Sequence, residues 1–150
     1  MFREYRKSGR LMGNAFQLTV VGEREVEAGR NLEDAFNEIR RMEALLTTFN
    51  GESQTQLINR HAGIKPVRVD AEVYSLIERS LMISRITDGF FDITYGSADL
   101  SFWNFDRSMT QLPDAETLRQ SIKLVDYRKI ILDPENHSVF LPEKGMRIGF

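Results

Sequence analysis

Few residues of this chain belong to the types that act as strong nucleophiles or soft metal ligands. There are no cysteines, and the only two histidines, His61 and His137, lie far apart in the sequence. The lack of cysteine excludes disulfides, thiolate nucleophiles, iron–sulfur clusters and cysteine-held zinc. No G-x-S-x-G elbow is present, so both histidines are expected in loops or at the surface. Any catalysis must therefore use carboxylates, hydroxyls, backbone amides, a bound cofactor or a hard metal ion.

Two loops combine apolar or aromatic side chains with groups that suit a flat ligand. In Leu11–Asn14, a glycine beside Met12 would let backbone approach a ring that the thioether covers. In Thr47–Asn59, Phe49 is followed by hydroxyl and amide side chains that could bond the polar edge of a stacked ring. On residue types alone, a turn with a core methionine and a polar surface loop remain the simpler alternatives.

A third loop, Gly89–Thr94, has the sequence GFFDIT. Two aromatics, a carboxylate and a hydroxyl in succession could form one wall of a ligand pocket. Asp92 and Asp99 could act as an acid–base pair, but their irregular spacing gives no reason to bring them together. Trp103 and Phe105 are expected to pack beneath this region. Taken singly, none of the three loops is better explained as a ligand site than as an ordinary structural loop.

Hydrophobic periodicity predicts the elements that would position these loops. The alternation of Phe16, Leu18 and Val20 predicts a strand over 14–21. Helices with one apolar stripe each are expected in three places: from an Asn31 cap to near Thr47, from an Asp70 cap to Gly89, and over 115–123 after Pro113. Short strands are expected at 67–69, 129–132, 138–141 and 146–150, with a turn at 133–136.

This order of elements predicts an α+β fold with helices packed on a mainly antiparallel sheet. The chain has 150 residues, of which 41% are hydrophobic, and no repeat or linker is visible, so one domain is expected. The lack of βαβ alternation and of a G-x-G-x-x-G motif argues against a Rossmann fold.

Charge and hydropathy exclude other classes of protein. The net charge is −2, which argues against a nucleic-acid binder. No apolar run approaches the length of a membrane span. The basic first ten residues lack a following apolar region, so no secretory signal is read, and a cytoplasmic location is expected from the sequence as written.

Together, the order and spacing of these motifs resemble the N-terminal part of the FAD:protein FMN transferases. These are the ApbE-type flavin transferases, formerly grouped as thiamine biosynthesis lipoproteins. The G-x-F-D-x-T element with a downstream tryptophan is fairly specific. The matching segments are Leu11–Phe16, Thr47–Phe49 with Ser53 and Asn59, Val67–Val69, Thr87–Gly96, Trp103–Phe105, 127–141 and 145–150.

The resemblance implies a transferase that binds FAD and, with Mg²⁺, moves its FMN part onto a threonine or serine hydroxyl of an acceptor protein. It implies FAD contacts at Met12, Phe49, Phe90, Phe91 and Asp92. The family usually has tyrosine at the Phe49 position, so stacking is kept and a phenolic hydrogen bond is lost. It often has alanine at the Phe90 position, so a bulkier side chain would narrow the pocket if it points inward.

In this family the strand corresponding to Met146–Phe150 leads into a Gly-rich, Lys-containing element, and the metal-binding positions lie from there onward. The resemblance therefore implies that this chain holds part of the FAD site, with no catalytic residue and no metal ligand. We expect it to be the N-terminal portion of a single flavin-transferase domain and inactive alone. A truncated homologue that binds without catalysing is the alternative. Many relatives are exported lipoproteins, so a removed N-terminal signal would place the protein in the periplasm or at the membrane.

Two other functions remain open. One is an FAD pyrophosphatase, which would release FMN and AMP by using water in place of the acceptor hydroxyl. The other is a flavin-binding module without turnover.

Overall fold

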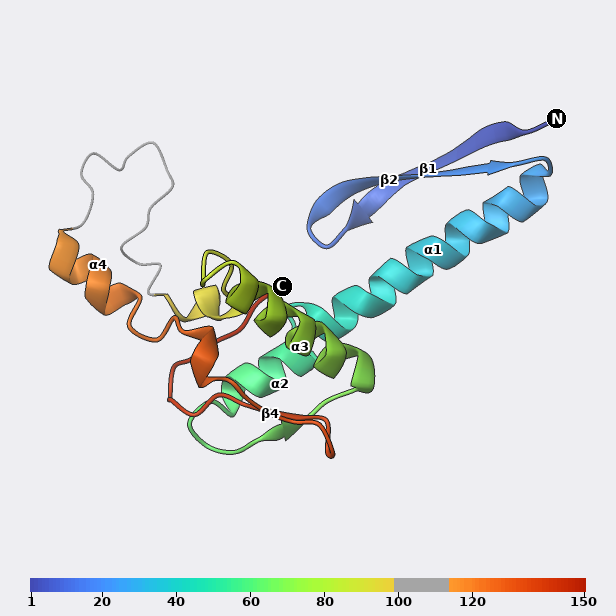
Figure 1. Cartoon of the computed structure of the whole chain (residues 1–150). Helices are drawn as coiled ribbons and strands as arrows, with labels where there is room; N and C mark the ends of the chain where they lie inside the picture. The colour runs from blue at the N-terminus through green and yellow to red at the C-terminus, as the bar shows by residue number, and fades with distance from the viewer. Residues whose placement is uncertain (99–113) are drawn as a thin grey trace. The chain divides into compact units, whose positions relative to one another are not determined.

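The structure is a computed structural model that describes residues 1–98 and 114–150 and divides into two compact units, Met1–Thr47 and Thr48–Phe150 (Figure 1). Several expectations lie outside the described residues and are not tested by it. They are the packing of Trp103 and Phe105 and the role of Pro113 as a helix opener; Asp99, whose pairing with Asp92 the spacing gave no reason to expect, also lies outside them.

The first unit begins with a β-hairpin. Strand β1 (Arg3–Leu11) pairs antiparallel with β2 (Asn14–Gly22) along its whole length, from Arg3↔Gly22 to Leu11↔Asn14. The predicted strand over 14–21 is confirmed, whereas β1 was not predicted. Met12 and Gly13 have φ angles of 51° and 73° and form the two-residue turn. Met12 is 42% exposed, so the alternative of a core methionine is wrong.

Helix α1 (Glu25–Leu46) lies along this hairpin (Figure 1). The predicted stripe is confirmed, with Leu32, Phe36 and Leu46 buried. The contact is close, because a Cβ at Gly9 would lie 2.8 Å from Cε1 of Phe36.

The predicted cap at Asn31 is wrong, because α1 begins at Glu25 with Arg24 in the cap position. Ala28 is buried and continues the apolar stripe one turn toward the N-terminus. Glu25 and Glu27 stand in the first turn, where carboxylates interact favourably with the positive end of the helix dipole.

The second unit contains a three-stranded antiparallel sheet in the order β3-β5-β4. Val139 lies at its centre, fully buried, and pairs with Val67 on one side and Leu132 on the other. The strands are β3 (Val67–Arg68), β4 (Ile131–Asp133) and β5 (Ser138–Phe140). Together with the first hairpin, this sheet confirms the predicted α+β class with antiparallel strands.

Helix α3 (Ala71–Ile86) packs its predicted inner stripe, with Val73, Ile77 and Leu81 buried. The Tyr74 ring on this helix lies 5.2 Å from the ring of His137, the residue before β5, so the first turn of the helix contacts the turn of the β4–β5 hairpin. Asp70 is the cap residue, as predicted, but its side chain makes no capping hydrogen bond. The carboxylate accepts instead from Nε2 of Gln54 at 2.6 Å.

The described part of the second unit also contains shorter helices. Helix α2 (Gln54–Arg60) overlaps the stretch Thr47–Asn59, which was predicted as a loop; Oγ of Ser53 caps it by accepting from the Gln56 amide at 3.1 Å. Helix α4 (Ala115–Ser121) and the 3₁₀ turns η1 (Ile93–Ser97) and η3 (Tyr127–Lys129) follow. Because Lys129 belongs to η3, β4 starts two residues later than predicted.

The predicted strand over 146–150 is wrong. Met146 and Ile148 are buried and Arg147 between them is exposed, but Gly149 is buried as well, and the segment pairs with none of the described strands. The side chains of Asn59 and Ser97 take its backbone hydrogen bonds in place of a neighbouring strand. No described helix is long and apolar enough to cross a membrane.

Candidate functional site

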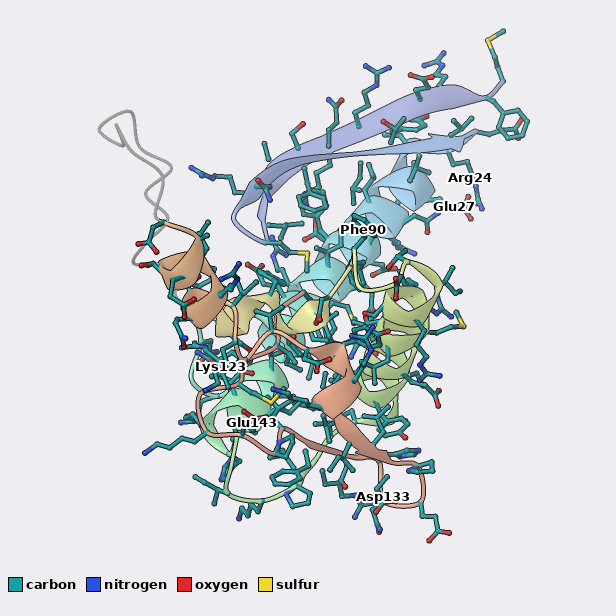
Figure 2. All side chains as sticks on the ribbon, turned by 60° about the vertical axis from the view of Figure 1, so that its left-hand side comes forward. Arg24, Glu27, Phe90, Lys123, Asp133 and Glu143 are labelled. Carbon is teal, nitrogen blue, oxygen red and sulfur yellow. The ribbon has the colours of Figure 1, made fainter. Side chains whose placement is uncertain are left out.

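The loop after α3 presents its aromatic residues through a tight turn. Asp88 and Gly89 both have positive φ, 51° and 82°, and the Gly89 amide donates to the Ser84 carbonyl at 2.8 Å. Oγ1 of Thr87 accepts from the Phe91 amide at 3.2 Å. Phe90 consequently stands at the tip of the loop and is 98% exposed (Figure 2). An aromatic ring this free of packing is available to a ligand.

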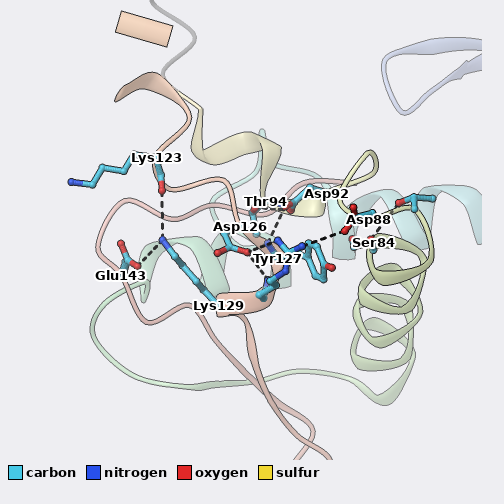
Figure 3. Close-up of polar contacts among 11 residues, drawn as sticks. Ser84, Asp88, Asp92, Thr94, Lys123, Asp126, Tyr127, Lys129 and Glu143 are labelled. Atoms are coloured by element: carbon cyan, nitrogen blue, oxygen red, sulfur yellow. Dashed lines mark hydrogen bonds and ion pairs between the residues drawn. The ribbon is translucent and has the colours of Figure 1, made fainter. Parts of the chain in front are cut away.

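The Asp92 carboxylate holds the base of this loop (Figure 3). Its Oδ1 accepts from the Thr94 amide at 2.8 Å and from the Thr94 hydroxyl at 2.6 Å. Its Oδ2 accepts from the Tyr127 amide at 2.9 Å. Thr94 is fully buried. Both carboxylate oxygens are thus engaged within the protein, and the groups left to face a ligand here are the phenyl rings and the loop backbone.

A basic cluster lies beside the same loop. The guanidinium of Arg128 lies 4.7 Å from the centre of the Tyr127 ring and forms an ion pair of 3.6 Å with Asp88. A pocket of about 360 Å³ is lined here by Leu81, Arg85, Tyr127, Arg128 and Ile130. The ion pair of Asp88 with Arg128 is a second link between the loop and η3, in addition to the hydrogen bond from the Tyr127 amide to Asp92.

A larger pocket, of about 520 Å³, lies where η1 meets the C-terminal segment. Its lining residues are Thr48, Tyr95, Gly96, Ser97, Ala98, Arg147, Ile148 and Gly149. A Cβ at Gly149 would lie 2.8 Å from the Tyr95 hydroxyl oxygen, so glycine is what lets this ring lie against the segment. None of these lining residues is acidic, and Arg147 supplies a positive charge. The wall described here therefore suits an anionic group.

The residues expected to contact FAD fall into three places. Met12 lies at the hairpin turn of the first unit. Phe49 lies at the start of the second unit, fully exposed and next to the pocket residue Thr48. Phe90, Phe91 and Asp92 share the loop after α3. Contact of these five residues with FAD stays a prediction.

Sequence reasoning missed Tyr95 and Arg147 as candidate site residues. Tyr95 directly follows the G-x-F-D-x-T element, which was a usable signal for its position. Arg147 had no such signal, because it reaches the pocket only through the packing of a segment 50 positions away from Ser97.

The described residues do not fit a metal site. Among residues 1–98 and 114–150, no group of three or more histidine, aspartate or glutamate side chains is placed to hold an ion. Asp92, the acidic residue nearest the loop aromatics, is committed to Thr94 and Tyr127.

The fold is that of solved flavin transferases. The ApbE protein of Thermotoga maritima superposes with a TM-score of 0.82 at 24% identity, covering 98% of this chain and 47% of that chain. The flavin transferase ApbE of Vibrio cholerae gives a TM-score of 0.81 at 14% identity, covering 99% of this chain and 48% of that chain. At these identities the likeness establishes the architecture.

The chain belongs to the ApbE family, whose profile matches residues 12–150. A protein of Klebsiella pneumoniae (strain 342) named FAD:protein FMN transferase is 34% identical over 146 residues, covering 97% of this chain and 45% of that protein. A Treponema pallidum (strain Nichols) protein of the same name is 28% identical, covering 97% and 42%. The resemblance drawn from the motifs is confirmed. This chain spans somewhat less than half the length of the curated relatives it matches.

Proposed function

We propose that the protein transfers FMN from FAD onto a threonine or serine hydroxyl of an acceptor protein, with Mg²⁺, and that this chain carries part of the FAD site. The observation that carries the proposal is the family match over residues 12–150, together with relatives named FAD:protein FMN transferase. The transfer breaks the diphosphate of FAD, joins the FMN phosphate to the acceptor hydroxyl and releases AMP.

The geometry of the second unit supports a site for FAD. FAD has a flat ring system at each end and a negatively charged diphosphate between them. Phe49 and Phe90 are almost fully exposed rings, which suits stacking on a flat heterocycle. The pocket at Tyr95 and Arg147 offers a hydroxyl and a guanidinium, which suit phosphate oxygens.

Under this proposal, the metal and the catalytic groups are assigned to no residue of this chain. A bound Mg²⁺ would neutralise charge on the diphosphate oxygens. The contribution proposed for this chain is binding: its aromatic rings orient the flavin or adenine, and its basic pocket wall receives an anionic part of FAD.

The decisive experiment uses the protein encoded by the complete reading frame, incubated with FAD, MgCl₂ and an acceptor domain. We expect a fluorescent, covalently flavinylated acceptor on a denaturing gel and an equal amount of AMP. The matched control is the same acceptor with its target threonine or serine changed to alanine. An unlabelled acceptor, under conditions where a known family member labels it, would refute the transferase.

The two alternatives are separated by omitting the acceptor. Release of FMN and AMP in its absence, at the rate seen in its presence, would indicate an FAD pyrophosphatase. Saturable FAD binding with no product under either condition would indicate a binding module. For the 150-residue chain alone we expect no transfer and weak or no FAD binding, measured by quenching of flavin fluorescence.

A further inference from the structure

The side chain of Asn59 makes a two-point contact with the backbone of Ile148. Its Nδ2 donates to the Ile148 carbonyl at 3.0 Å, and its Oδ1 accepts from the Ile148 amide at 2.8 Å. The two residues are 89 positions apart. In an antiparallel sheet, the amide and the carbonyl of such a residue are normally both bonded by the neighbouring strand. Here one amide side chain on α2 takes the place of that strand.

The residues on either side of Ile148 are held in a related way. Oγ of Ser97 accepts from the Arg147 amide at 2.7 Å and donates to the Arg147 carbonyl at 3.0 Å. The Gly149 amide donates to the Ile93 carbonyl at 3.0 Å. Three consecutive residues are therefore bound by three separate groups, two of them side chains.

The same amide network reaches a second lining residue of the 520 Å³ pocket. Nδ2 of Asn59 lies 3.5 Å from Oε1 of Gln56, and Nε2 of Gln56 donates to the Thr48 carbonyl at 2.6 Å. Thr48 and Ile148 both line the pocket. Asn59 consequently bonds one lining residue, Ile148, directly and another, Thr48, through Gln56.

Burial makes these bonds costly to lose. Ile148 is 1% exposed, so its amide and carbonyl have little access to water if Asn59 is removed, and an unsatisfied buried polar group carries the full desolvation cost. Ile148 is buried in the core, whereas its neighbour Arg147 is exposed and lines the pocket.

We infer that Asn59 and Ser97 are positioning residues, which hold Arg147–Gly149 extended and so set the Arg147 guanidinium and the Gly149 backbone at the pocket wall. Ser97 is one of the described lining residues of the pocket, whereas Asn59 is not among them and acts through the segment that it holds. The identification of the ligand as FAD rests on the proposed function, whereas the holding of the segment rests on the contacts alone.

The test compares Asn59→Ala, Ser97→Ala and Ser97→Thr with Ser80→Ala. Ser97→Thr keeps the hydroxyl and is the conservative rescue. Ser80→Ala is the matched control, because it deletes a hydroxyl that bonds a carbonyl, that of Leu76 at 2.8 Å, elsewhere in the unit.

Two quantities are measured. In the 150-residue chain, amide hydrogen exchange at Arg147 and Ile148 is followed by NMR; we expect it to quicken about tenfold in Asn59→Ala and Ser97→Ala and to stay unchanged in the other two. In the protein encoded by the complete reading frame, we expect the dissociation constant for FAD to rise about tenfold in the same two variants, and less than about twofold in Ser97→Thr and Ser80→Ala.

Each outcome decides something. Unchanged exchange at both amides overturns the holding of the segment. Faster exchange with wild-type FAD affinity overturns its positioning role, and equal losses in Ser80→Ala show a general effect of stability instead. If the wild-type protein binds no FAD, the proposed function fails, and the exchange rates by themselves still support or overturn the holding of the segment. If Asn59→Ala does not fold, the comparison of Ser97→Ala with Ser97→Thr provides the test.

Discussion

Asp92 and Tyr127 are joined by a hydrogen bond of 2.9 Å between the Asp92 carboxylate and the Tyr127 amide, across 35 positions of sequence. The same carboxylate holds the buried Thr94 through its amide and its hydroxyl. It therefore links the loop that carries Phe90 to the 3₁₀ turn before β4 (Figure 3). Asp92 was expected to contact the ligand. Instead, both of its carboxylate oxygens accept hydrogen bonds that hold the loop in shape.

Asp92→Asn should destabilise the chain. An amide keeps one accepting oxygen and cannot serve both Thr94 and the Tyr127 amide, so we expect a loss of about 1–3 kcal/mol in the free energy of unfolding. Urea denaturation followed by circular dichroism measures it. Thr94→Ser, which keeps the hydroxyl, is the control for the small change in packing. A midpoint for Asp92→Asn equal to that of the wild type would contradict the structural role of the carboxylate.

Phe90→Ala should separate ligand binding from folding. The ring is 98% exposed, so its removal should change the free energy of unfolding by less than about 0.5 kcal/mol. Loss of a stacking partner should weaken FAD binding by about 0.5–1.5 kcal/mol, roughly 2- to 13-fold in the dissociation constant. Both are measured on the protein encoded by the complete reading frame.

The control for Phe90→Ala is Ile86→Ala, which truncates another exposed apolar side chain, 76% exposed on α3. It should leave FAD affinity unchanged. If the two variants lose affinity equally, or if neither does, Phe90 is not a specific ring contact.

Gly149→Ala should disturb the pocket wall. The added methyl group would lie 2.8 Å from the Tyr95 hydroxyl oxygen, and the ring must move to make room. Overpacking of this kind costs about 1–3 kcal/mol in the free energy of unfolding. In a Tyr95→Ala background the clash is gone, so the cost of Gly149→Ala should largely disappear, as a double-mutant cycle would show.

Gly29→Ala serves as the matched glycine control. Gly29 lies within α1, and a Cβ there would meet nothing within 4 Å. Replacement in a helix interior should raise the free energy of unfolding by roughly 0.5–1 kcal/mol. If Gly149→Ala behaves like Gly29→Ala, the close approach of Tyr95 does not constrain position 149.

Tyr74 should make the stability of the chain pH-dependent in alkali. Burial raises the pKa of its phenol, and the nearby carboxylates of Glu78 and Asp133 raise it further. The ordinary pKa of tyrosine is about 10. The stabilisation tied to the protonated phenol is therefore fully present below about pH 10 and is lost as the pH rises through the raised folded-state pKa.

The comparison is between wild type and Tyr74→Phe, whose free energies of unfolding are measured from pH 8 to 11. The wild type should lose stability relative to Tyr74→Phe as the pH rises above about 10, since phenylalanine has no proton to lose. Parallel pH profiles for the two proteins would show that Tyr74 does not titrate differently in the folded state.

Local patterns in the sequence predicted much of the fold. The period-2 alternation of Phe16, Leu18 and Val20 placed β2, and the 3.6-residue stripe placed α3, because both are set by which face of a segment is buried. Helix α2 was not predicted, because its polar sequence shows no apolar stripe. Its formation depends on the Ser53 cap and on the burial of Ile58. The order of the motifs, not any one of them, indicated the ApbE family.

By itself, the sequence determined the class of fold and the family, which rest on local patterns and on the order of those patterns along the chain. Only the tertiary structure decided that Asp92 bonds the Tyr127 amide and that Asn59 replaces a strand beside Ile148. Residues 146–150 were predicted as a strand, whereas the backbone of Arg147 and Ile148 bonds the side chains of Ser97 and Asn59. Burial is readable from periodicity, whereas the partner of a backbone amide 89 positions away is chosen by packing.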